Sequence, residues 1–146
     1  MFYIGIDTGV NTGIAVWDNK QRSLIAVDCV KIHKAMEIVK QYMNKAADVG
    51  TSVYVRVEDA RQRKWICDKY SKDGTKYNIQ QGAGSVKRDA TIWEDYLTDL
   101  GVRFQMVAPK NNATKLPSGS FAAMTGWKKR TNEHRSEEHT SELQSR

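Results

Sequence analysis

The sequence predicts an α/β domain built on a mixed five-stranded sheet, with helices packed on both faces. Two observations predict this class. Three short strands joined by tight links come first, and helices then alternate with two further strands. Of the 146 residues, 40% are hydrophobic and 27% are charged, which is typical of a globular domain with one hydrophobic core.

The first three elements are predicted strands. Residues 2–7 and 12–18 are rich in apolar side chains and are joined by a turn containing glycine and asparagine, which favours a hairpin. Residues 23–30 predict a third strand after another short link. Links this short favour antiparallel pairing.

The hydrophobic period changes after the third strand. Apolar residues recur at helical spacing over 32–47, and Gly50 follows as a stop, so this segment predicts an amphipathic helix. Residues 52–58 alternate as a fourth strand. Residues 60–84 are polar and contain glycine, and they predict a long loop.

A second helix is predicted over 85–100, with Ser85 as its N-cap and Gly101 as its C-terminal stop. Residues 102–107 predict a fifth strand, and 118–125 predict a short helix. The alternation of helix and strand in this half favours a sheet that is parallel here and antiparallel at the start.

The chain changes character after His134. Thr131 or Asn132 would cap a last helix, but residues 135–146 contain one large apolar residue and no amphipathic period. This segment resembles the conceptual translation of a sequencing adapter. We therefore expect 1–134 to be the natural domain, with its last helix cut short, and 135–146 to be a non-native tail. A genuine polar terminus is the alternative.

Charge and cysteine content narrow the class of partner and the compartment. The formal net charge is +6, which favours a polyanionic partner. Cys29 and Cys67 form no metal-type pair and are expected to be buried or half-buried thiols, so an intracellular, cytoplasmic location is favoured. Neither a signal peptide nor a membrane-spanning segment is expected.

Two carboxylates stand at predicted strand ends. Asp7 closes the first strand and Glu58 closes the fourth. Functional groups gather at the carboxyl ends of strands in α/β sheets, and two close carboxylates repel each other unless a cation is present. Mg²⁺ prefers oxygen ligands, so the pair predicts a metal site for phosphoryl transfer. Two unrelated surface acids at loop starts are the alternative.

Four segments within residues 1–134 resemble RuvC-like Holliday-junction resolvases, and most of all their phage-type relatives: IGIDTGVNTGIAV, VRVEDAR, GAGSVKRDATIWEDYL and VAPKNNATKLPSGSFAAMTGWKKRTNEH. The resemblance implies a ribonuclease H-like fold with the first and fourth strands adjacent and parallel. It also implies a homodimeric bacterial or phage endonuclease that cleaves branched DNA. Asp7 and Glu58 would bind two Mg²⁺ or Mn²⁺ ions.

The same resemblance implies a catalytic last helix that carries a histidine and, three residues later, an aspartate. His134 matches the first position, and Glu137, within the suspected tail, occupies the second. The extra methylene of Glu moves its carboxylate by roughly 1.5 Å, about one carbon–carbon bond. Misplacement of that order costs about 100-fold in rate, so we expect this chain to be impaired. An ordinary exposed helix residue is the alternative for His134.

Basic residues gather in three clusters around the two acids, and all three are predicted to bind DNA. A helix N-terminus after a glycine-rich loop favours phosphate, and Trp65 could stack on an exposed or distorted base, although it could also pack the loop onto the domain. The clusters and their neighbours are Arg61, Arg63, Lys64 and Trp65; Ser85, Lys87 and Arg88; and Lys128, Lys129 and Arg130.

Two other functions stay open. A non-catalytic DNA-binding module of the same fold fits a chain without its final acidic helix. The segment from Asp7 to Gly13, DTGVNTG, also resembles the first phosphate loop of the actin-like sugar-kinase and chaperone superfamily, which implies ATP binding, although the chain is short for that class.

Asp59 is not expected to take part in catalysis, because it should face away from Glu58 and pair with Arg61.

Overall fold

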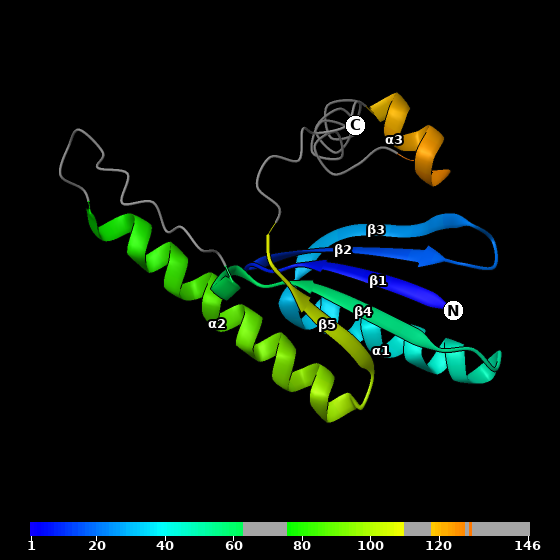
Figure 1. The fold of residues 1–146 in the computed structure, drawn as a ribbon, viewed down its shortest axis with the longest axis horizontal. Helices are drawn as coiled ribbons and strands as arrows, with labels where there is room; N and C mark the ends of the chain where they lie inside the picture. The colour runs from blue at the N-terminus through cyan, green and yellow to red at the C-terminus, as the bar shows by residue number, and fades with distance from the viewer. Residues whose placement is uncertain (63–75, 110–117, 128, 130–146) are drawn as a thin grey trace, which may run out of the picture.

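Five strands form one sheet in the order β3-β2-β1-β4-β5 (Figure 1). The computed structural model describes residues 1–62, 76–109, 118–127 and 129. The first three strands pair antiparallel, whereas β1 with β4 and β4 with β5 pair parallel, which confirms the predicted mixed sheet. The bounds are β1 Phe2–Asp7, β2 Asn11–Asp18, β3 Ser23–Lys31, β4 Val53–Glu58 and β5 Arg103–Val107.

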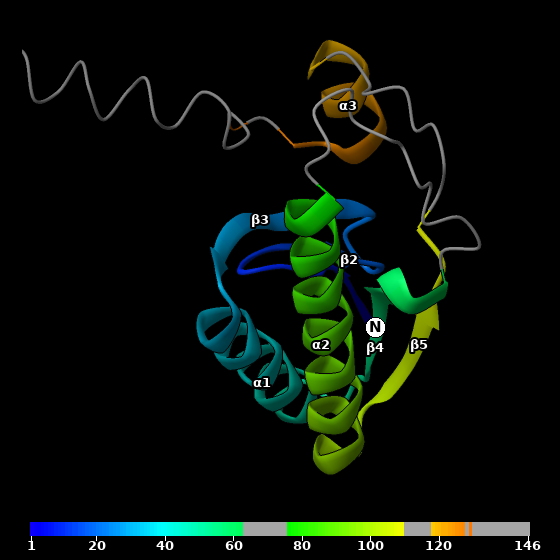
Figure 2. The ribbon, with the colours of Figure 1, turned by 90° about the vertical axis from the view of Figure 1, so that its left-hand side faces the viewer.

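Two long helices, α1 (Ile32–Asp48) and α2 (Lys76–Leu100), cover the same face of this sheet (Figure 2). The sequence predicted helices on both faces but did not assign these two helices to one of them. The short helix α3 (Ser118–Thr125) lies apart from them, on the other side of the sheet in Figure 2. The predicted last helix falls outside the described residues. The face that α1 and α2 leave uncovered is called the open face below.

The core lies between the sheet and the two long helices. Alternate residues of β1 and β4, among them Ile4 and Val57, point into it, and Val39 of α1 and Leu97 of α2 meet them, each no more than 1% exposed. Burying each such side chain contributes about 1.5–3 kcal/mol. Since strand side chains alternate between faces, this burial forces the intervening residues onto the open face.

The N-terminus of α2 differs from the prediction. The helix begins at Lys76, so Ser85 is not an N-cap and the predicted loop over 60–84 is wrong from residue 76 on. Gly82 and Gly84, which suggested a break, lie inside the helix. Each costs about 1 kcal/mol relative to alanine, a cost that helix propagation from the packed half of α2 can offset.

We expect Leu97→Ala to destabilise the protein by about 2–5 kcal/mol, because it empties a fully buried position between α2 and the sheet. Urea unfolding followed by circular dichroism measures this. Ile92→Ala is the matched control, since Ile92 lies on the same helix but is 40% exposed. Its effect should stay within about 0.5 kcal/mol. Equal losses in the two variants would contradict the described packing of α2.

Candidate active site

Asp7 and Glu58 end neighbouring parallel strands and are partners in the same register. Paired residues of adjacent strands lie about 4.8 Å apart and direct their side chains to the same face. Asp7 is exposed and Glu58 is half-buried, whereas the preceding Ile6 and Val57 are buried on the helix side. The adjacency expected for these two acids is therefore present, on the open face at the carboxyl ends of the two strands.

Gly13 of β2 makes room for the Asp7 carboxylate. The two residues are register partners, and a Cβ at Gly13 would lie 3.3 Å from Asp7 Cβ and 3.9 Å from its Oδ2. A contact of 3.3 Å would force one of the side chains to shift. Glycine at this position thus leaves room for the Asp7 side chain next to β2.

Two threonines brace the loop that follows Asp7. The Thr8 hydroxyl donates a hydrogen bond of 3.1 Å to the main-chain carbonyl of Glu58. Thr12 is fully buried, and its hydroxyl donates to the Gly9 carbonyl at 2.9 Å, which closes the turn. The segment that resembled a phosphate loop therefore fixes the end of β1 against the end of β4.

Asp59 faces the helix layer and is 3% exposed. Arg61 Nε donates to its Oδ1 at 2.8 Å and Nη2 donates to its Oδ2 at 2.9 Å, which confirms the predicted Asp59–Arg61 pair. Arg61 Nη2 also contacts Glu94 of α2 at 2.6 Å. The guanidinium thus links the 3₁₀ turn η1 (Ala60–Gln62) to α2, and a role for Arg61 in DNA binding gains no support.

The hydrogen bonds from Arg61 lower the pKa of the Asp59 carboxyl, and they outweigh burial, which raises it. The pKa of the guanidinium of Arg61 is raised in turn, first by its hydrogen bond to Asp59 and then by that to Glu94. Both groups are therefore held in their charged forms. Consecutive acids, Glu58 and Asp59, thus face opposite sides of the sheet.

The other predicted DNA contacts divide into two groups. Ser85, Lys87 and Arg88 lie within α2, where no free helix N-terminus binds phosphate, so the reason given for that cluster is wrong. Arg88 is exposed, and so is Lys129. The remaining predicted residues lie outside the described part of the chain: Arg63, Lys64, Trp65, Lys128, Arg130, His134 and Glu137.

Arg56 was not among the predicted site residues. It lies on β4 two residues before Glu58 and is exposed on the same face. The signal was present in the strict alternation of VYVRVE, which puts Tyr54, Arg56 and Glu58 on one side of the strand. The expectation of a buried or half-buried Cys29 was also wrong, since this thiol is exposed. Cys67 lies outside the described residues.

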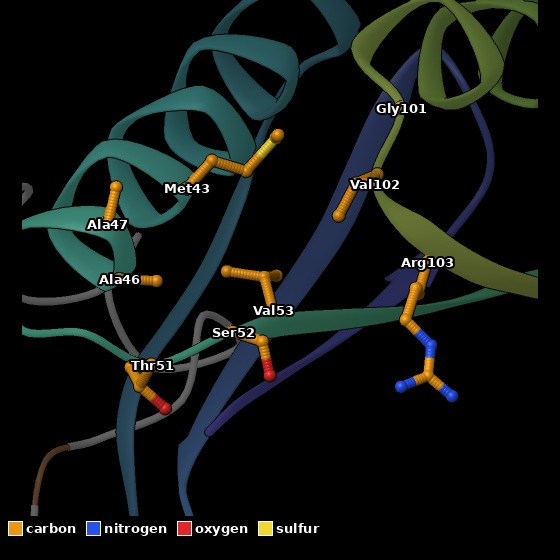
Figure 3. A pocket seen from close by; sticks show the side chains of 9 residues that line it. All are labelled: Met43, Ala46, Ala47, Thr51, Ser52, Val53, Gly101, Val102 and Arg103. Carbon is orange, nitrogen blue, oxygen red and sulfur yellow. The ribbon is translucent and has the colours of Figure 1, made fainter.

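An open pocket of about 240 Å³ lies at the other end of the strands, between α1 and the starts of β4 and β5 (Figure 3). Met43, Ala46 and Val53 contribute to its largely apolar wall. No carboxylate is among the described residues that line it. Its lining therefore offers no carboxylate ligand for a divalent metal.

The donor chemistry at Asp7 and Glu58 fits Mg²⁺ or Mn²⁺. Within the described residues no group of three or more His, Cys, Asp or Glu side chains is placed to hold a metal. Two carboxylates are nevertheless sufficient for Mg²⁺, which retains several waters and is often bound by one or two carboxylates together with substrate phosphates. These two residues would be the protein's ligands.

Comparison with known proteins gives no further guide, since no family model and no curated protein matches the chain. Function is therefore inferred from the geometry and from the resemblance of its motifs.

Among the described residues, every helix is too short or too polar to cross a bilayer.

Asp59→Asn should destabilise the protein by about 1–3 kcal/mol at neutral pH, because it removes charge-assisted hydrogen bonds to Arg61. The pKa of Asp59 is lower in the folded state, so its contribution is present above the unfolded-state pKa and is lost as pH falls through the folded-state pKa. The difference between parent and variant should therefore shrink below about pH 4. Urea unfolding at neutral and acidic pH measures it.

Glu37→Gln is the control for this prediction, since Glu37 forms an exposed ion pair with Lys34 at 3.0 Å. Its effect should stay below about 0.5 kcal/mol. A difference between parent and Asp59→Asn that is the same at both pH values would contradict the role given to the Asp59 carboxylate.

Proposed function

We propose that this protein is a divalent-metal-dependent endonuclease that hydrolyses DNA phosphodiesters, at Holliday junctions or other branched DNA. One observation supports it above all others: Asp7 and Glu58 are register partners on neighbouring parallel strands, and both lie at the carboxyl ends on the open face. This is where an α/β sheet gathers functional groups.

Membership of the RuvC-like resolvases and a ribonuclease H-like fold belong to the same proposal. The resemblance of the motifs implied an acid on the first strand, a glutamate after the fourth, and parallel pairing of these strands. The observed order β3-β2-β1-β4-β5 is consistent with all three. Resolution of a junction needs two symmetric cuts, so we propose that the active form is a homodimer.

The residues of this site would act mainly by holding the metal ions and by keeping the two carboxylates in a fixed orientation. Asp7 and Glu58 would bind one or two Mg²⁺ or Mn²⁺ ions, which when bound neutralise phosphate and lower the pKa of a water molecule. Gly13 leaves room for the Asp7 carboxylate, and Thr8 holds the following loop on β4, so the two acids are kept at a fixed separation. Preorganised ligands avoid a reorganisation cost during the reaction.

His134 and Glu137 keep their proposed roles of completing the site or positioning water, although they lie outside the described residues. An acid from the final helix would supply the third carboxylate. Because sequence analysis predicts a non-native segment after His134, a form of the chain with a restored acidic last helix belongs in every cleavage test.

Asp7→Asn is expected to lower cleavage of a labelled four-way junction in Mg²⁺ or Mn²⁺ by at least about 100-fold, because a small misplacement of a catalytic group already costs that much. Asp48→Asn is the matched control, since Asp48 is an exposed acid at the end of α1. The parent chain and the chain with the restored helix are compared by gel assay, with EDTA as the metal-free reference.

Cleavage that persists in EDTA, or is unchanged by Asp7→Asn, would exclude the proposed chemistry. DNA binding without cleavage in both forms of the chain would instead assign a binding module. Equal rates of cleavage of branched and linear DNA would indicate a general nuclease rather than a resolvase. ATP binding that depends on the loop after Asp7 would favour the actin-like alternative.

A further inference from the structure

The open face beyond the acid pair carries both basic and aromatic side chains. The strands β1, β4 and β5 contain four charged residues, and the sheet register places all of them on this face: Asp7, Glu58, Arg56 and Arg103. The acids lie at one end, and the two arginines follow along β4 and β5. Both arginines are exposed.

Arg56 is the cation nearest to the acid pair along the strand. It lies two residues before Glu58, about 6.7 Å away along β4, and its register partner on β1 is Gly5. Because glycine has no side chain, the space above Gly5 is open, and a Cβ built there would meet nothing within 4 Å. Arg56 therefore borders an open part of the face.

Aromatic side chains continue this surface. Tyr3 and Tyr54 are the next register pair along β1 and β4, their ring centroids lie 6.1 Å apart, and Tyr3 is 40% exposed. The Tyr54 hydroxyl donates to Gln105 Oε1 at 3.3 Å, which orients its ring. Arg103 is the β5 partner of Tyr54, and Figure 3 shows its side chain directed away from α1.

These residues form a path about 13 Å long, from Glu58 through Arg56 to Tyr54. Guanidinium groups bind phosphate, and exposed aromatic rings stack on bases that are not paired. A guanidinium next to a metal-binding acid pair would oppose the metal's charge. Its position is favourable when an anion lies beside the metal.

We propose that the open face of β1, β4 and β5 binds the DNA strand that leads into the cleavage site. Arg56 binds the phosphate next to the scissile one, Arg103 binds a more distant phosphate, and Tyr3 stacks on an unpaired base. The occupant is a single strand, as exposed at a branch point. This inference rests on the proposed function, whose site it extends, but its tests measure binding rather than cleavage.

The first test is the salt dependence of binding. Arg56→Gln should weaken binding of a fluorescent single strand and of a four-way junction, and it should reduce the slope of log affinity against log salt by about 1. Fluorescence anisotropy in EDTA and again in Ca²⁺ measures both quantities. Lys40→Gln is the matched control, because Lys40 is exposed on α1, on the other side of the sheet, and its loss should leave the slope unchanged.

The second test blocks the path. Gly5→Val should weaken binding by at least about tenfold, and Gly5→Ala by less, because a side chain there keeps the strand off the sheet. The added Cβ meets nothing within 4 Å, so the melting temperature should not fall. If the melting temperature does fall, Arg56→Gln and Tyr3→Leu test the inference instead. We expect Tyr3→Leu to bind about fivefold more weakly.

An unchanged salt slope in Arg56→Gln together with tighter Mg²⁺ binding would overturn the inference, since Arg56 would then only balance the charge of the acids. An altered oligomeric state in Gly5→Val at unchanged DNA affinity would assign the face to a second copy of the chain. Absence of DNA binding by the parent also overturns it. If the Arg56, Gly5 and Tyr3 variants bind DNA normally and still show cleavage that depends on Asp7, this inference is overturned but the proposed nuclease function is not.

Discussion

The parallel pairing of β1 with β4 is the constraint on which the rest of the structure depends. It joins residues 2–7 to residues 53–58, which are separated in the chain by two strands and a helix, and it aligns Asp7 with Glu58. A shift of one residue in this register would turn one carboxylate into the core. The buried side chains of both strands, including Ile6 and Val57, oppose such a shift because it would expose them.

This register gives the two faces of the sheet separate roles. On the helix side, the buried Asp59 holds Arg61, whose guanidinium joins the end of β4 to Glu94 of α2. On the open face, the Asp7 side chain is exposed to solvent and that of Glu58 is half-buried. Because these consecutive residues face opposite sides of the sheet, Asp59 contributes to stability on the helix side, whereas Glu58 belongs to the candidate site on the open face.

Part of the site was predictable from local sequence, because an acid that directly follows an alternating apolar strand stands at its end. Asp7 and Glu58 were recognised in this way. Arg56 was missed because an arginine inside a strand is usually a solvated surface residue. Only its neighbours on β1 show that it lies close to the acid pair. The start of α2 was misplaced because Gly84 and Ser85 have the local pattern of a helix cap, whereas packing of the following turns against the sheet lets the helix continue through them.

The sequence by itself determined the number and type of strands, the extent of α1 and α3, and the two acids at strand ends, because the periods of 2 and 3.6 residues and the turn residues act locally. Only the tertiary structure decided that β5 lies beside β4, that α1 and α2 share one face, and that Arg61 also binds Glu94 of α2. These features depend on contacts between residues far apart in the chain, whose free energy comes from burial of a common core. No local pattern contains that information.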